Sequence, residues 1–581
     1  MRQESQENRK EAAGDRFGGS PPRSHSSAVS ARFDPSSSLR PRKARLQWLA
    51  GHAGPKEAPA QGPRSVSTAV AGPGVRGRAL RPRPPSRRSQ PPDRAFRALR
   101  LALALAASIG ASACSEQPAA PASSAQPLLL VIGVDGLEWD VVLPLVRSGR
   151  APHLARLMER GTWGALETAT PTFSPVLWTT IATGKRPVVH GIEGFTRRTH
   201  AAEGSQARER LVRSEDRRCA ALWTIASACG KRAALLGWWA SYPAEPIDGV
   251  LVSQRSGFGA ELAKGGPFGS LTGQVHPPER EAWVASVRDA VVDEERDHAP
   301  GLAPWAAPMQ LDARAARTLP PLERRLLEPC RTSMRADEIY ARLALDLLHD
   351  DEEAFDVLAV YLGSPDVVGH RFWRYHEPQR FREPIGAEAL ANCASLVSDN
   401  VAWIDAWVGR LMAAAGPDVN VVVLSDHGMR AVRTEAAFQA EAPLAELNSG
   451  HHLDAPPAVW IAAGPTVRSS DQDLAASPQH LLGLLDVLPT WLSWLDLPIG
   501  RDMPGRVAEA TVALDHLRTC PPRRIESYEA FVPLPAPSAP DAPGAPSSAD
   551  ADAERAGRAR LDELRGLGYL GASGGEEDDG E

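Results

Sequence analysis

The chain has 581 residues, of which 43% are apolar and 23% charged, an ordinary composition for a globular protein. Its six cysteines include no pair with CxxC spacing, so the sequence indicates neither a thiolate zinc site nor a disulfide framework. The charge is uneven along the chain. Residues 1–100 hold 21 Lys and Arg against 7 Asp and Glu, whereas residues 101–581 hold 44 against 64, a formal charge of −20.

The basic first part of the chain predicts no packed core. Residues 1–93 are rich in Pro, Ser, Gly and Ala and lack periodic apolar residues, so they cannot bury enough surface to offset their ordering entropy. We interpret them as a disordered extension upstream of the true start. An Arg-rich arm that binds nucleic acid is the alternative. It is disfavoured because the arm precedes an export signal and would be removed with it.

That signal is the segment 94–114, "RAFRALRLALALAASIGASAC", with a basic start, a short apolar run and small residues at its end. The run is shorter than the roughly 20 residues that span a membrane. The ending at Cys114 resembles a lipoprotein signal, although Ala111 stands where Leu is usual. We therefore expect an exported periplasmic or cell-surface protein, anchored to the membrane by a lipid on Cys114. An ordinary secretory signal is the alternative.

After a polar linker, 115–127, the pattern changes to alternating strands and helices. Uniformly apolar runs predict buried strands, and segments with helical spacing lie between them. The expected strands are 128–134, 232–238, 355–362, 420–426 and one near 458–465. The expected helices are 141–160, 176–183, 219–229, 336–349, 390–414 and 477–496. This alternation predicts an α/β domain over 128–510 with a doubly wound, mainly parallel sheet and helices on both faces.

Other segments interrupt or follow this domain. Residues 255–335 are rich in Pro, Gly and charge, and we interpret them as a cap inserted over the active face. Residues 531–555 read as a disordered linker and 572–581 as an acidic tail. Between them, 556–571 predicts a short helix that docks back on the domain.

Acidic residues follow three of the predicted strands. Asp135 ends "LLLVIGVDG", Asp366 lies beyond "VLAVYL", and Asp426 ends "VVVLSD". A single Asp in such a place is usually a turn former or a helix cap. Three of them are better explained by a ligand, because ligands in open α/β sheets bind outside the carboxyl ends of the strands.

Histidines accompany these acids. His370 lies one helical turn after Asp366, His427 directly follows Asp426, and His452 lies in the loop before the next strand. Carboxylates mixed with imidazoles suit zinc or a similar divalent ion, and they are too many for one tetrahedral site. The set therefore predicts two divalent metal ions, which bind the oxygens of a phosphate-type ester.

A hydroxyl nucleophile is expected in "TPTFSPVLWTTIATGKRPVVHGI", residues 170–192. Ser174 is predicted at the N-cap of the helix 176–183, with Pro175 at its first position, which suits plain capping. A hydroxyl there would also lie where the helix dipole favours an anion. Spacing alone does not choose Ser174 over Thr172, Thr179 or Thr180.

Together these segments resemble the alkaline phosphatase superfamily, in particular its type I phosphodiesterase and nucleotide pyrophosphatase branch. The resemblance covers about residues 128–510 and rests on seven blocks in family order, among them "GVDGLEWD", "GSPDVVGHRFWRY", "LSDHGM" and "SGHHLDAPPAVWIAAGP". It implies two zinc ions, one held by Asp135, Asp426 and His427 and the other by Asp366, His370 and His452. Spacing within the last block favours His452 over His451.

The resemblance also places the nucleophile on Ser174, which would bind metal and form a covalent phospho-enzyme. One departure matters: nucleotide pyrophosphatases have an asparagine shortly after "HGI", where this chain has Phe195. Lys185 or a backbone N–H could take that phosphate-binding role, although Lys185 is equally read as a surface residue. The aromatic residues Trp238, Trp239, Trp373 and Tyr375 read as core residues, with stacking on a substrate as the alternative.

These observations predict a metal-dependent hydrolase of phosphoric esters, preferably diesters, acting on a small molecule or a head group. The alternatives are a phosphotransferase or phosphomonoesterase of the same superfamily, or a surface-anchored binding protein without activity. A sulfatase is disfavoured, because the sequence after Ser174 and Pro175 lacks the required Arg.

Overall fold

The computed structural model of the protein describes most of the predicted domain. The described residues are 129–199, 208–257, 273–297, 319–350, 352–432, 447–454, 456–534, 561, 564 and 565. The predicted extension 1–93, the signal 94–114 with Cys114, the linker 115–127, residues 535–555 and the tail 572–581 lie outside them. Within the described ranges, no helix combines the length and the apolar character needed to cross a membrane.

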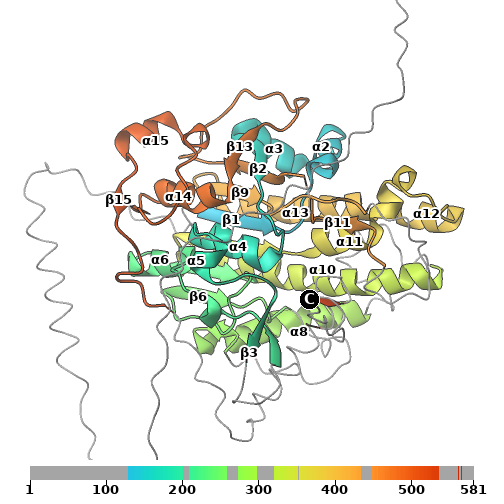
Figure 1. Cartoon of the computed structure of the whole chain (residues 1–581), viewed down its shortest axis with the longest axis horizontal. Coiled ribbons are helices and arrows are strands. Elements are labelled where there is room, and N and C mark those ends of the chain that lie inside the picture. The colour runs from blue at the N-terminus through green and yellow to red at the C-terminus, as the bar shows by residue number, and fades with distance from the viewer. Residues whose placement is uncertain are drawn as a thin grey trace, which may run out of the picture. The chain divides into compact units, whose positions relative to one another are not determined.

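A nine-stranded sheet forms the centre of the described domain, in the order β13-β2-β12-β9-β1-β8-β5-β6-β7 (Figure 1). Its strands are β1 (Leu129–Val134), β2 (Thr162–Glu167), β5 (Ala233–Leu236), β6 (Gly249–Val252), β7 (Val275–His276), β8 (Val357–Leu362), β9 (Asn420–Leu424), β12 (Ala458–Ala463) and β13 (His480–Gly483). Strand β12 is antiparallel to β9 and β2, and β7 is antiparallel to β6. The remaining pairs are parallel.

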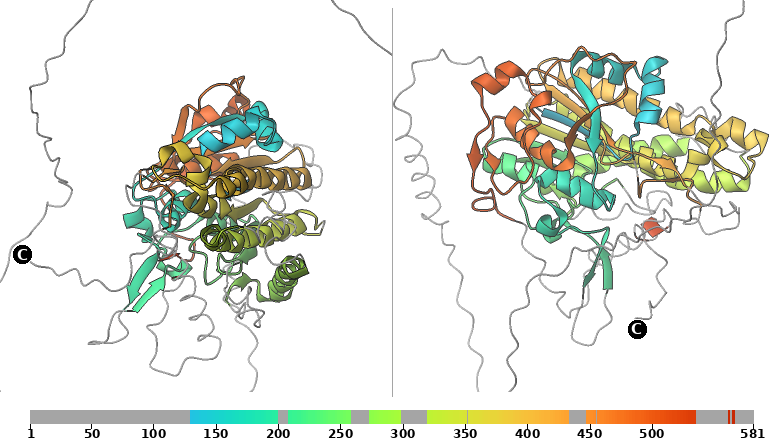
Figure 2. Two further views of the ribbon diagram at one scale, coloured as in Figure 1. Left: turned by 90° about the vertical axis from the view of Figure 1, so that its right-hand side faces the viewer. Right: turned by 45° about the horizontal axis from the view of Figure 1, so that its top comes forward.

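Both faces of the sheet are buried, which explains the uniformly apolar strands. In β1, Leu130, Ile132 and Val134 belong to one buried cluster, whereas Leu129 and Val131 belong to another. Successive side chains of a strand point to opposite faces, so a sheet with helices on both sides needs apolar residues at every position. Figure 2 shows the helices on the two sides of the sheet. The predicted doubly wound, mainly parallel α/β fold is confirmed.

The helices divide between the two faces. On the side of Ile132 lie α2 (Trp139–Arg147), α3 (Pro152–Arg160), α10 (Pro321–Leu348), α11 (Ser364–His376) and α13 (Leu396–Ala415). On the side of Val131 lie α4 (Ser174–Thr183), α6 (Leu222–Ala228) and α14 (Leu484–Trp494). The shorter helices are α5 (Pro187–His190), α12 (Ala387–Cys393) and α15 (Leu514–Thr519), and α8 (Glu281–Asp297) packs on α10. Short paired strands are β3 (Thr196–Thr199) with β4 (Arg208–Leu211), β10 (Arg430–Ala431) with β11 (Gly450–His451), and β14 (Ile499–Gly500) with β15 (Arg524–Ile525).

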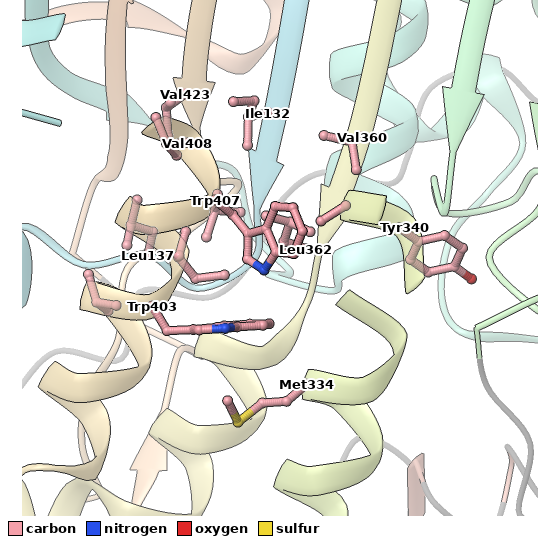
Figure 3. Packing of buried hydrophobic residues seen from close by; sticks show 14 of the residues in the cluster. Ile132, Leu137, Met334, Tyr340, Val360, Leu362, Trp403, Trp407, Val408 and Val423 are labelled. Carbon is pink, nitrogen blue, oxygen red and sulfur yellow. The ribbon is translucent and has the colours of Figure 1, made fainter. Parts of the chain in front are cut away.

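Packing beneath the three central strands holds them in register. Ile132 of β1, Val360 of β8 and Val423 of β9 share a buried cluster with Trp403 and Trp407 of α13 (Figure 3). Each aliphatic side chain that is fully buried in this way stabilises the fold by about 1.5–3 kcal/mol. The carboxyl ends of β9, β1 and β8 are therefore fixed next to one another.

Several boundaries differ from the sequence prediction. The segment 141–160 forms two helices, because the chain turns at Gly149 with a φ of 75°. The segment 390–414 also divides, into α12 and α13, and the first residues of 477–496 form β13 instead of helix. Strands β2, β6, β7 and β13 were not predicted, since short apolar runs at or near a sheet edge carry little periodicity.

The segment 255–335 is partly built into the domain. Residues 275–276 form β7 at the edge of the sheet, and Val284, Val291 and Met334 of α8 and α10 belong to the main buried cluster. The prediction of a cap can therefore concern only residues 258–272 and 298–318, which lie outside the described residues.

Of the predicted C-terminal helix 556–571, Leu561, Leu564 and Arg565 are described and helical. The two leucines are buried in the cluster on the Val131 side, and Arg565 Nη2 lies 3.1 Å from Glu209 Oε2. All five described cysteines are free thiols.

Candidate metal centre and nucleophile

The candidate site lies at the carboxyl ends of β9, β1 and β8, three neighbouring parallel strands. Asp135 directly follows β1, Asp426 and His427 follow β9 after one residue, and Asp366 lies in the first turn of α11 after β8. Each of these side chains is at most 4% exposed. The sheet order thus brings together groups that lie up to about 290 residues apart in the chain.

Glycines allow the backbone to approach closely at this edge. Gly136 has a φ of 65°, and a Cβ built there would lie 2.9 Å from the Cα of Asp366. A Cβ on Gly428 would lie 2.0 Å from Oε2 of Glu138. Gly136 is therefore required by the close approach of Asp366, because a side chain there would push the two backbones apart, whereas a Cβ on Gly428 would displace the Glu138 carboxylate.

Two further histidines complete the cluster. His370 lies one turn after Asp366 in α11, and its Nε2 is 3.4 Å from Asp366 Oδ1. His452 comes from the loop after β11, and its Nε2 is 3.8 Å from the same oxygen. The rings of His427 and His452 stack with centroids 3.9 Å apart. All six side chains that the sequence selected as ligands therefore meet in one place.

The ligand atoms form two overlapping groups. Asp135, Asp426 and His427 make up one, and Asp366, His427 and His452 the other, each with its ligand atoms within 4.8 Å of one another. His427 belongs to both, with Nε2 3.4 Å from Asp135 Oδ1. The first group is the one expected from the family resemblance. In the second, His427 stands where His370 was expected, while His370 contacts the same Asp366 oxygen as His452.

The second ring nitrogen of each histidine is held by a neighbouring oxygen. Nδ1 of His370 is 2.8 Å from the Gly450 carbonyl oxygen, and Nδ1 of His427 is 3.0 Å from the Gly428 carbonyl oxygen. A carbonyl oxygen can only accept, so these Nδ1 atoms carry the protons and each Nε2 presents a lone pair. This arrangement is typical of histidines that bind a metal.

Three atoms of the first group face one another without donors. Asp135 Oδ1, Asp426 Oδ2 and His427 Nε2 are buried and have no hydrogen-bond partner in the part of the chain that the structure describes. Buried acceptors without donors are costly, and a cation satisfies all three together. The residues present therefore fit a bound divalent ion.

The electrostatics of the cluster also favour a cation. Burial raises the pKa of Asp135, and the charge of Asp366 adds to this. Burial and the charge of Asp135 raise the pKa of Asp426 well above its usual range. Burial lowers the pKa of His452, and His427 lowers it further. The carboxylates repel one another, and a divalent cation reverses that balance.

Asp135 is held by donors that the sequence analysis did not select. Trp178 Nε1 donates to Asp135 Oδ2 at 3.2 Å, and the Tyr361 hydroxyl donates to the same oxygen. Trp239 Nε1 in turn donates to the Tyr361 oxygen at 2.9 Å. With Oδ2 occupied, Asp135 presents only Oδ1 to the cluster. The one signal for Tyr361 in the sequence was a hydroxyl within the apolar run "VLAVYL".

Ser174 lies at the start of α4, one position later in the helix than predicted. Phe173 occupies the N-cap and Ser174 is the first helical residue, so the serine does not cap the helix. Trp178, one turn further on, donates to Asp135, and positions i and i+4 share a helix face. Ser174 therefore lies on the face of α4 that is turned toward the cluster.

The competing hydroxyls are engaged elsewhere. Thr179 and Thr180 donate to the backbone oxygens of Pro175 and Val176, at 2.6 and 2.9 Å. Thr172 donates to the His452 carbonyl oxygen at 2.8 Å. The Ser174 side chain has no hydrogen bond within the described ranges. Of the four candidate hydroxyls, Ser174 is thus the one that forms no hydrogen bond with the described residues.

Lys185 is placed away from the cluster. It follows the C-terminal end of α4, whose ten residues span about 15 Å from Ser174. Its side chain is 3% exposed and pairs with Asp502 and with Glu529, the latter at 3.4 Å. Lys185 is therefore a buried ion-pair residue and not a surface lysine, and a phosphate-binding role for it stays a prediction.

Phe195 lies in an aromatic cluster with Phe173, the residue before Ser174. Its ring centroid is 5.7 Å from that of Phe173 and 5.6 Å from that of Trp239. Trp238, Trp373 and Tyr375 are at most 3% exposed, as expected for core residues. The position that holds an asparagine in nucleotide pyrophosphatases is therefore apolar here.

Comparison with known proteins identifies the family of the chain. Residues 129–487 match the family of type I phosphodiesterases and nucleotide pyrophosphatases, and the chain belongs to this family. The membership confirms the resemblance to the alkaline phosphatase superfamily and points to a hydrolase. No curated protein matches the chain significantly.

Among solved structures, the chain is similar to phosphonoacetate hydrolase from Sinorhizobium meliloti in complexes with phosphonoformate and with phosphonoacetate. The identities are 18% and 17%, with a TM-score of 0.30 for each. The matches cover 53% and 54% of this chain and 57% and 58% of the hydrolase. The chain thus matches less than two thirds of the length of these neighbours.

Proposed function

We propose that this protein hydrolyses phosphodiesters at a site of two divalent metal ions, with Ser174 as the nucleophile. The single observation that carries the proposal is the set of buried acceptors on Asp135, Asp426 and His427 that face one another without donors. Asp366, His370 and His452 would hold the second ion. Carboxylate and imidazole ligands together favour zinc.

Two such ions would stabilise negative charge on the oxygens bound to phosphorus and lower the pKa of a nearby hydroxyl. The Ser174 oxygen attacks phosphorus, the bond to one ester oxygen breaks, and the alcohol leaves with the serine proton. A water oxygen then attacks the phosphoserine, and Ser174 leaves as its hydroxyl. The rigid strand ends and the buried Nδ1 contacts keep the ligand atoms in place throughout.

The test combines metal content with turnover. We expect about two metal ions per chain by elemental analysis, and hydrolysis of bis-p-nitrophenyl phosphate in preference to p-nitrophenyl phosphate. Ser174→Ala should retain the metal and lose at least about 10³-fold in kcat. Thr179→Val is the matched control, because its hydroxyl donates to the helix backbone, and it should keep most of the activity. Activity that survives Ser174→Ala would move the nucleophile elsewhere, and protein without bound metal would overturn the proposal.

A further inference from the structure

A second cluster of charged and aromatic side chains lies at the same edge of the sheet as the metal centre. Tyr242 follows β5, Arg255 follows β6, and Arg213 follows β4. The guanidinium carbon of Arg255 lies 3.9 Å from the centre of the Tyr242 ring, and that of Arg213 lies 5.8 Å from it. Both guanidinium groups thus lie over the same tyrosine ring. All three side chains are partly exposed.

These two arginines lack acceptors. Nε of Arg213 and Nε of Arg255 are buried without a hydrogen-bond partner, and neither guanidinium forms an ion pair within the described ranges. A buried donor that is left unsatisfied carries a desolvation cost. Both side chains are partly exposed, so the guanidinium nitrogens other than the buried Nε are the donors that an oxyanion could reach.

The neighbouring charges leave the cluster positive. Arg197 and Arg210 both pair with Asp216, and Glu215 also lies close enough to act on Arg255. Four guanidinium groups against two carboxylates give a formal charge of +2. Burial, followed by repulsion from Arg213 and Arg210, lowers the pKa of Arg255 to about 10, so it remains charged at neutral pH.

The cluster lies within reach of a substrate bound at the metal centre. Strand order β1-β8-β5-β6 places β6 two strands from β8 and three from β1. Adjacent strands are about 4.8 Å apart, so the end of β6 lies roughly 10–14 Å along the edge from the ends of β8 and β1.

Aromatic side chains connect the surroundings of Ser174 with those of Arg213. The Val212 N–H donates to the Phe195 carbonyl oxygen at 3.0 Å, which fixes Arg213 beside Phe195. The Phe195 ring contacts Phe173, the residue before Ser174. Phe195 is buried and Phe173 is partly exposed, so Phe173 is the apolar residue of this pair that a substrate can contact.

We propose that Arg213, Arg255 and Tyr242 form a subsite for a second phosphate group of the substrate. The inference rests on the proposed function. Guanidinium forks bind phosphate through paired hydrogen bonds, and a terminal phosphate carries a charge of about −1.5 to −2, which matches the cluster. The preferred substrate class is then a phosphodiester with one substituent that has an apolar spacer and ends in a phosphate.

The test uses alkanediol bisphosphates of increasing chain length as competitors of bis-p-nitrophenyl phosphate, next to the matching alkyl monophosphates. Calorimetry measures the same affinities directly. At the best length, the bisphosphate should bind about tenfold or more tightly than the monophosphate. Arg255→Gln and Arg213→Gln should each remove most of that preference, whereas Arg255→Lys should keep part of it, since it retains the charge but not the fork.

Arg410→Gln is the matched control, because Arg410 also stacks on an aromatic ring, 4.6 Å from the centre of Trp407 in α13, and it should retain the full preference. Equal affinity for both ligands in the wild type, or a preference that survives both arginine variants, would overturn the subsite. Tighter binding of an alkyl phosphate that ends in a carboxylate would overturn the choice of phosphate. If bis-p-nitrophenyl phosphate is not hydrolysed at all, the proposed function fails, and the calorimetric comparison still decides on the subsite.

Discussion

At the scale of single residues, the site depends on which oxygen or nitrogen of each ligand is occupied by a neighbour. Asp135 receives two donors on Oδ2, and His370 and His427 each have Nδ1 held by a backbone oxygen. Each contact leaves one ligand atom directed into the cluster. The residues that direct the ligands are as important to the geometry as the ligands themselves.

Tyr361 provides the first prediction. Tyr361→Phe removes one donor to Asp135 and frees the carboxylate to rotate, so the affinity for metal should fall about tenfold or more, which chelator competition measures. Tyr375→Phe is the matched control, because the Tyr375 hydroxyl donates to Glu323 Oε1 at 2.7 Å, away from the ligand atoms. Unchanged metal affinity in Tyr361→Phe would show that Trp178 alone orients Asp135.

His190 is buried where α5 ends, away from the ligand atoms. Its Nδ1 accepts from Ile192 N at 3.2 Å, so Nε2 carries the proton and donates to Thr180 Oγ1 at 3.1 Å. Burial, together with Arg217, lowers the pKa of His190 to about 3. The folded state therefore binds this proton less readily than the unfolded state.

The second prediction follows from the lowered pKa of His190. The stability contributed by neutral His190 is present above the unfolded pKa of about 6.5 and is lost as the pH falls toward 3. His190→Gln should reduce the slope of unfolding free energy against pH by up to about 1.4 kcal/mol per pH unit in this range. Urea unfolding at several pH values measures the slope. An equal slope in both proteins would contradict a neutral His190.

At the scale of elements, carboxylates on one helix fix the start of another. Asp337 of α10 accepts from Gly363 N at 2.7 Å and Ser364 N at 2.8 Å, at the beginning of α11, which carries Asp366 and His370. Asp405 of α13 accepts from Leu154 N at 2.7 Å at the beginning of α3. Both contacts satisfy backbone donors that a helix leaves unpaired.

These two contacts give the third prediction, because only one of them supports the site. Asp337→Ala and Asp405→Ala should each lower the unfolding free energy by about 1–2 kcal/mol. Only Asp337→Ala should also weaken metal binding and lower kcat, since α11 provides two ligands and α3 none. Thermal melting and metal titration of both variants measure this. Equal metal affinity in the two variants would show that the contact of Asp337 with α11 does not support metal binding.

At the scale of the whole molecule, the candidate metal centre joins segments from much of the chain. Its proposed ligands follow β1, β8, β9 and β11, whose positions are set by the common buried clusters on both faces of the sheet. Without a cation, the buried acceptors that lack donors lower the stability of this packing. Binding should therefore stabilise the domain as a unit.

Removal of metal is the fourth prediction. Treatment with a chelator should lower Tm, because a ligand that binds only the folded state stabilises it by about 2.7 kcal/mol at 100 times its Kd. Re-addition of zinc should restore Tm, and in Asp426→Asn the restoration should be weaker. A chelator that leaves Tm unchanged, in protein shown to lose its metal, would contradict the link between the site and stability.

The sequence by itself determined the α/β class, the core strands and the six candidate ligands, because buried strands are uniformly apolar and polar residues at their ends stand out. It also limited the nucleophile to four hydroxyls. Periodicity did not reveal the short strands β2, β6, β7 and β13, nor the division of 141–160, because a few residues at a sheet edge or a helix break carry no periodic signal.

Only the tertiary structure decided what depends on contacts between distant segments. It placed Lys185 in a buried ion pair at the far end of α4, distinguished Ser174 from three bonded threonines, and identified Tyr361 and Trp178 as partners of Asp135. It also brought Arg213 and Arg255 to one tyrosine from different strands. The local sequence pattern indicates which residues are buried and which face of a helix they share. The hydrogen-bond partner of a polar atom, in contrast, depends on the order of strands in the sheet.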